Sequence, residues 1–122
     1  MNQQKHIHLA RRKMSHVIDE LYTALLLAGG KRVTLEITKE PEGLRLVARG
    51  GFDEAHRRQV ERMAEMLQPA VRNPALVEEF WELAGGDQYT SDSELALVGQ
   101  MVDRASAAVG EGQVELDLFI AF

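Results

Sequence analysis

The side chains of this sequence best suited to acid–base or phosphotransfer chemistry are four histidines and one acidic pair. The histidines are His6, His8, His16 and His56. The acidic pair, Asp19-Glu20, lies one helical turn after His16. Adjacent residues of a helix point about 100° apart, so these two carboxylates cannot work together as an acid–base pair. We therefore expect Asp19 to lie on a solvated face.

The histidine spacing bears on metal binding and on phosphotransfer. His6 and His8 are two residues apart, so on a strand both would face one side, as metal ligands do. No second group of His, Asp or Glu joins them by sequence, so we expect no metal site and a solvated segment. His16 lies beside the apolar positions of a predicted helix, at its solvent edge. The alternative is a phosphoacceptor His16, although the acidic residue that usually follows such a histidine is missing.

Several kinds of catalytic site are excluded by residues that the sequence lacks. There is no cysteine, which excludes disulfides, thiolate zinc sites and a cysteine nucleophile. No Gly-x-x-x-x-Gly-Lys-Ser phosphate loop is present. No Ser, His and Asp arrangement stands out as a catalytic triad.

Length and charge narrow the class of protein. The 122 residues, 45% of them hydrophobic, suit one globular domain over residues 1–122. The longest apolar run, Ala24 to Ala28, is too short to cross a membrane, and we expect a cytoplasmic location without a secretion signal. The net charge of −5 argues against a nucleic-acid partner. Arg11-Arg12-Lys13 is a local exception: it predicts a solvated helix start or, alternatively, a docking patch for an acidic partner.

Helical spacing predicts a first helix that ends at Gly29-Gly30. Its apolar stripe comprises Met14, Val17, Ile18, Leu21, Leu25 and Ala28. Glycine accepts the left-handed conformation at a helix end, which predicts the stop. The helix start is open, because His6–Leu9 could form a first helical turn or a short strand. We therefore describe residues 1–9 as a flexible or short-strand segment.

Alternating apolar residues predict a β-hairpin over 32–49, with Lys39–Gly43 as its turn and Gly50-Gly51 after its second strand. Helices are predicted over 54–68 and, after Pro74, up to Gly85-Gly86. In the latter helix Phe80 faces inward, so an exposed Trp81 would be an anchor for a partner.

The C-terminal third predicts one long helix and a last strand. Ser91 and Glu94 have the spacing of a capping box that opens the helix. Its apolar face comprises Leu95, Val98, Met101, Val102, Ala105 and Val109. A strand follows over Val114–Phe122. The predicted class is α+β, a two-layer α/β sandwich with helices packed on one face of a mostly antiparallel sheet.

Three segments resemble the GHKL ATPase family, which includes histidine-kinase catalytic domains and anti-sigma kinases. The run His16–Leu25 resembles the family's N-box helix, and Gly43–Phe52 the strand before its Asp-x-Gly-x-Gly box. The runs Ser93–Asp103 and Gly110–Leu116 resemble the later glycine-rich segment, helix and closing strand. The resemblance implies a Bergerat-like fold, and it places Glu20 at the acidic position that acts as general base in the family.

The residues that hold ATP and Mg²⁺ in this family are not matched. Ala24 stands at the position of the Mg²⁺-binding asparagine, and an alanine methyl cannot ligate a hard cation. Arg49 stands near the adenine-binding aspartate and has no acceptor atom. Ser93 and Ala96 stand near two of the phosphate-wrapping glycines. We therefore expect no cofactor, with ATP and Mg²⁺ as the alternative.

These observations predict a non-catalytic regulatory or protein-interaction domain of bacterial signal transduction, of the two-component or partner-switching type. The expected partner is a response regulator, sigma factor or kinase, bound through Trp81, Arg11 and Arg12. A homodimer is a further expectation. The alternatives are an active anti-sigma-type serine kinase with Glu20 as its base, or a histidine phosphotransferase that uses His16.

Overall fold

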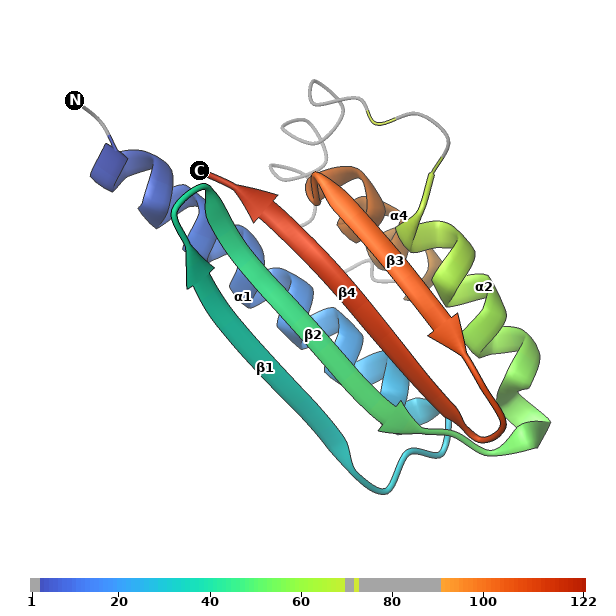
Figure 1. The fold of residues 1–122 in the computed structure, drawn as a ribbon. Coiled ribbons are helices and arrows are strands. Elements are labelled where there is room, and N and C mark those ends of the chain that lie inside the picture. The colour runs from blue at the N-terminus through green and yellow to red at the C-terminus, as the bar shows by residue number, and fades with distance from the viewer. Residues whose placement is uncertain (1–2, 70–71, 73–90) are drawn as a thin grey trace.

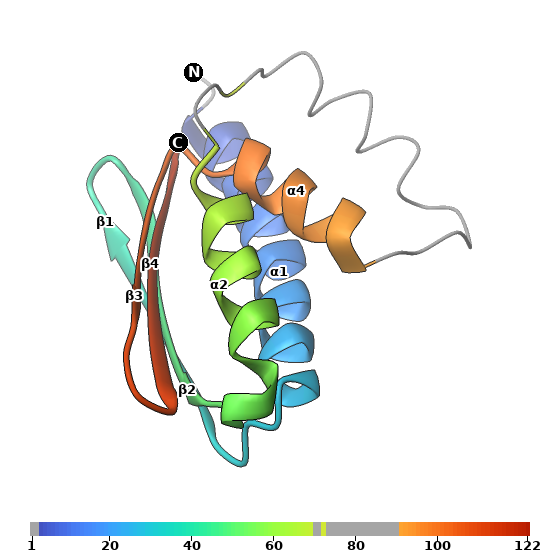
Figure 2. The ribbon, with the colours of Figure 1, turned by 90° about the vertical axis from the view of Figure 1, so that its right-hand side faces the viewer.

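The computed structural model describes residues 3–69, 72 and 91–122, and these form two layers. A four-stranded sheet makes one layer and the helices make the other (Figures 1 and 2). The helices are α1 (Gln3–Leu27), α2 (Arg57–Leu67), preceded by a 3-10 turn over Glu54–His56, and α4 (Ser91–Met101). The strands are β1 (Val33–Glu40), β2 (Gly43–Gly51), β3 (Arg104–Val109) and β4 (Gln113–Ala121). The predicted two-layer α+β class is confirmed.

The strands follow the order β1-β2-β4-β3, and every neighbouring pair is antiparallel. Figure 2 shows α1, α2 and α4 on the same face of this sheet. The core lies between the layers and includes Val17, Leu21, Leu46, Val98 and Leu116, all fully buried. Among the described helices, none combines the length and apolar character that a membrane crossing needs.

Helix α1 confirms the predicted apolar stripe and the predicted stop. Its inward residues Met14, Val17, Leu21 and Leu25 are buried. Gly29 has a φ of 93°, the left-handed conformation that glycine adopts without steric cost. The helix begins at Gln3, so His6–Leu9 is a helical turn, the first of the two alternatives for these residues, and not a short strand.

The first hairpin is tighter than predicted. Strand pairing continues through Glu40↔Gly43, so the connection is Pro41-Glu42 alone. Leu44, Leu46 and Ala48 face the core as predicted, because alternate residues of a strand point to opposite faces.

The prediction of one long helix through Val109 is wrong. Helix α4 ends at Met101, and Arg104–Val109 forms strand β3 beside β4. Asp103 fixes this change of direction, because its N–H donates to the Phe119 carbonyl (2.8 Å) and its Oδ2 accepts from the Ala121 N–H (2.7 Å). Alanines at 105 and 107 favour a helix locally, so pairing with β4 overrides their own preference and decides the conformation.

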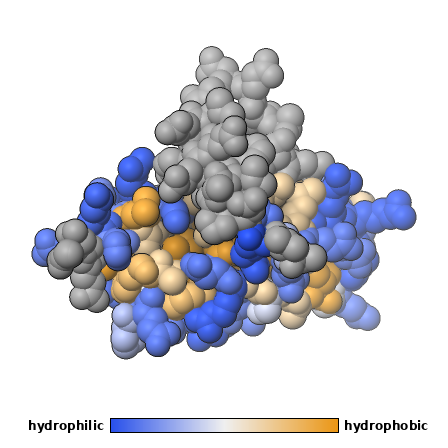
Figure 3. All heavy atoms as spheres, turned by 90° about the horizontal axis from the view of Figure 1, so that it is seen from above, coloured by the Kyte–Doolittle hydropathy of each residue, from blue (hydrophilic) through white to orange (hydrophobic). Residues whose placement is uncertain are grey.

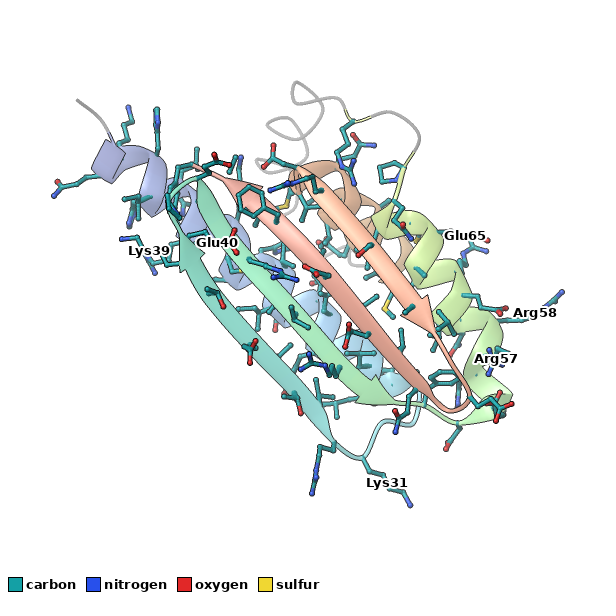
Figure 4. All side chains as sticks on the ribbon, in the orientation of Figure 1. Lys31, Lys39, Glu40, Arg57, Arg58 and Glu65 are labelled. Atoms are coloured by element: carbon teal, nitrogen blue, oxygen red, sulfur yellow. The ribbon has the colours of Figure 1, made fainter. Side chains whose placement is uncertain are left out.

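The turns at one end of the sheet are joined by a polar network. Glu54 accepts from the Gly112 N–H (2.9 Å), and Arg57 donates to the Gly110 carbonyl (2.9 Å). Arg57 also binds the Glu54 carboxylate at 2.7 Å, and this contact lowers the pKa of Glu54. Figure 4 shows Arg57 at this junction, whereas Arg58 and Glu65 point away from α2.

The sheet face opposite the helices carries paired charges. Arg45 binds Asp117 through two hydrogen bonds (3.0 and 2.5 Å), which hold the pKa of Asp117 below its usual range. Arg49 binds Glu115 at 2.7 Å. Seen from above, the described surface is largely hydrophilic, with apolar residues in smaller groups (Figure 3). These exposed pairs contribute little to stability and keep the face solvated.

Candidate metal centre

Three side chains that can ligate a metal ion meet between α1 and α4. His16 and Glu20 are four residues apart on α1, so they lie one above the other on the same helical face. Glu94 comes from the first turn of α4, which packs across α1. One nitrogen of His16 and one carboxylate oxygen from each glutamate lie within 4.8 Å of one another. We call these three residues the His16 cluster.

The cluster is largely shielded from water. Glu20 is 3% exposed and Glu94 is 7% exposed, although carboxylates are almost never fully buried unless they are paired. The His16 side chain is 22% exposed, although its Nε2 is itself buried. Its Nε2 lies 3.2 Å from Glu94 Oε2.

Two carboxylates at this separation repel one another. At an effective dielectric constant of about 20, two like charges 4 to 5 Å apart repel by roughly 3 to 4 kcal/mol. With a neutral His16, the three side chains carry a charge of −2. A divalent cation balances that charge in full.

The donor atoms suit a transition-metal ion. One imidazole nitrogen and two carboxylate oxygens match the mixed ligands of zinc, manganese or iron sites. Ions bound at about 2.0 to 2.1 Å in a tetrahedron bring neighbouring ligand atoms to roughly 3.3 Å. The 3.2 Å between His16 Nε2 and Glu94 Oε2 is close to that spacing. Glu20 would be the third ligand of such an ion, and a water molecule could be the fourth.

Sequence reasoning found two of these residues and missed the third. His16 and Glu20 were candidates in separate reactions, and the structure brings them into one cluster. Glu94 was interpreted as half of a capping box with Ser91, whereas its carboxylate lies against His16. The available signal was His16-x-x-x-Glu20 beside a buried stripe, together with a second glutamate directly before the apolar run Leu95–Val98.

The other predicted site residues do not join the cluster. Asp19 is exposed, as expected, and so are His6 and His8. Arg11 is also exposed and its Nη2 lies 3.3 Å from His8 Nδ1. Arg12 is exposed on the same helix. Trp81 and the predicted helix that contains it lie outside the described residues.

The positions that the ATPase resemblance assigns to nucleotide binding are separated in the fold. Ala24 lies on α1, which covers one face of the sheet. Arg49 points from the opposite face and binds Glu115. The two positions therefore lie on opposite sides of the sheet.

A hollow at the glycine-rich end of the sheet is the other place where phosphate could bind. It is lined by Gly29, Lys31, Arg32, Gly50, Gly110 and Gly112, among others. Phosphate loops bind through free backbone N–H groups. Here the N–H groups of Gly29, Gly110 and Gly112 all donate to protein oxygens, so they do not form such a loop.

No protein-family model, curated protein or solved structure matches this chain.

Proposed function

We propose that this domain binds one divalent transition-metal ion at the His16 cluster. The observation that carries the proposal is the burial of Glu20 and Glu94 within 4.8 Å of His16. Burying Glu94 is costly unless a cation or hydrogen bonds compensate its charge, and its Oε2 has no hydrogen-bond partner within the described part of the chain. Three ligating atoms from two helices supply a binding site that needs only small side-chain adjustments.

The test is a calorimetric titration of the metal-free protein with Zn²⁺ and Mn²⁺. We expect one ion per chain, and a loss of affinity of about 100-fold or more in His16→Ala, Glu20→Gln and Glu94→Gln, since each variant removes a direct ligand. His8→Ala and Asp19→Asn are matched controls on the same helix and should bind as the unaltered protein does. Equal affinity in all five variants would show that the ion binds elsewhere. Circular dichroism of each variant checks that the fold is kept.

In this proposal the domain acts in cytoplasmic signalling, on a scaffold similar to the GHKL ATPases. The order of a helix that carries Glu20, a hairpin and further helices supports that similarity, whereas the described chain then ends in two strands, β3 and β4, instead of a long helix and one strand. The separation of Ala24 from Arg49 supports a role without ATP. The metal ion would then have a regulatory or structural part.

A second candidate function, the binding of a signalling protein, is favoured by apolar side chains at the end of α1. Tyr22, Leu26 and Leu27 are 42%, 46% and 67% exposed. Leu27 borders a hollow between α1 and α2 that Val60, Met63 and Met66 also line. Methionines adapt to different partner shapes, which suits such a surface.

Photocrosslinking in the native cell tests this second function. A photoreactive residue in place of Leu27 should give an adduct with one response regulator, sigma factor or kinase. The same group in place of Arg49, on the opposite sheet face, is the control and should give none. Equal adducts from both positions would count against a docking surface at the end of α1.

A further inference from the structure

The two ends of α4 are attached to the rest of the domain in different ways. Near its C-terminal end, Val98 is fully buried and Gly99 packs directly against the backbone of Met66 at the end of α2. The Nε of Arg72 donates to the Gly99 carbonyl at 3.0 Å. This end is held by close packing and a hydrogen bond, neither of which depends on a bound ion.

The N-terminal end of α4 meets α1 through the His16 cluster. Glu94, in the first turn, is buried against His16 with its Oε2 3.2 Å from the imidazole. The neighbouring Leu95 is also buried, so docking this turn necessarily brings Glu94 close to Glu20. Without a cation, that step brings two carboxylates together out of water. With a divalent ion, the same step completes its coordination.

We propose that the metal ion works as a clasp between α1 and α4, so that ion occupancy controls how firmly the first turn of α4 is docked. This inference rests on the proposed metal site and adds its consequence for the fold. The clasp joins two helices that are far apart in the sequence, since His16 and Glu20 come from one and Glu94 from the other.

The ligand atoms of the His16 cluster also determine which ions can bind there and link α1 to α4. Ca²⁺ takes six to eight oxygen ligands, and Mg²⁺ demands octahedral oxygen coordination and gives up its waters reluctantly. A cluster of one imidazole and two carboxylates supplies three donors, one of them nitrogen, which favours Zn²⁺, Mn²⁺ or Fe²⁺. Zn²⁺ should therefore dock the first turn of α4, and Mg²⁺ at the same concentration should not.

Hydrogen exchange at single amides tests the clasp. The first α4 amides that donate within the helix belong to Leu95, Ala96 and Leu97. Saturating Zn²⁺ should slow their exchange by about 10-fold or more relative to Val102 and to the β2 amides, because local opening of this turn becomes rarer. Mg²⁺ should leave these rates unchanged. In Glu94→Gln, Zn²⁺ should have no effect on them.

The possible outcomes distinguish the proposal that the ion docks α4 from the proposal that the ion binds at all. If calorimetry shows one bound Zn²⁺ while exchange at Leu95–Leu97 is unchanged, the clasp is wrong and the metal site stands. If protection rises uniformly over α1, α4 and the sheet, the ion stabilises the whole domain, and control of the α4 turn is likewise overturned. If calorimetry shows no binding in the unaltered protein, both proposals fail together.

Discussion

The substitution Gly99→Ala is expected to lower the free energy of unfolding by about 1 to 3 kcal/mol. A methyl group at this position would overlap the Met66 carbonyl oxygen and press on the Leu67 backbone. Both neighbours are main-chain atoms, so the new carbon is accommodated only if α2 and α4 move apart. That separation also strains the Arg72 hydrogen bond to the Gly99 carbonyl.

The expected loss of stability is opposite in sign to the usual effect of replacing a helical glycine with alanine. Within an ordinary helix, exchanging glycine for alanine stabilises the protein by about 1 kcal/mol, because alanine has the higher helix propensity. For Gly99→Ala to destabilise the protein, the steric overlap with the α2 backbone must therefore cost more than the gain in helix propensity. Ala96→Gly is the matched control, at an exposed position of the same helix, and should lose about 1 kcal/mol from propensity alone. Urea unfolding measures both variants. A more stable Gly99→Ala would contradict the packing of α4 against α2.

The triple substitution His16→Leu, Glu20→Met and Glu94→Met, which replaces the whole cluster by apolar side chains, is expected to raise the stability of the metal-free protein by about 1 to 4 kcal/mol. Both carboxylates are buried, and methionine fills a similar volume without charge. Replacing buried ionic groups with apolar ones of similar size is often stabilising, because their desolvation is costly. The same variant should gain no stability from Zn²⁺, whereas the unaltered protein should gain it in proportion to binding.

This comparison distinguishes a metal site from a purely structural cluster. If His16, Glu20 and Glu94 served mainly to hold α1 and α4 together by hydrogen bonds, the triple variant would lose stability. Thermal unfolding with and without Zn²⁺ gives the answer in one experiment. Leu26→Met, at an exposed position of α1, is the control for adding methionine and should change stability by less than about 0.5 kcal/mol.

The parts of the fold that follow from local pattern were predicted from the sequence. The stripe of α1, its stop at Gly29 and the alternation of β2 each depend on residues close together in the chain. Strand β3 was missed for a physical reason. Alanine by itself favours a helix, so Ala105 and Ala107 fit the predicted helix, and only pairing with Leu118 and Leu116 of β4 makes them a strand.

The cluster was only half predictable from the sequence, because its two halves depend on different kinds of information. His16 and Glu20 share a helical face, which their spacing of four reveals. Glu94 joins them only through packing between α1 and α4, and no local pattern encodes that contact. Its burial is visible only in the structure, because in the sequence Glu94 ends the polar run Ser91–Glu94 and fits a capping box.

The most direct measurement of the central claim is X-ray absorption at the zinc edge, on protein loaded with one equivalent of Zn²⁺. The account predicts nitrogen and oxygen ligands at about 2.0 to 2.1 Å, with the outer scattering of one imidazole. That imidazole signal should vanish in His16→Ala and persist in His8→Ala. An unchanged spectrum in His16→Ala would contradict the account, because the ion would then be held by another histidine.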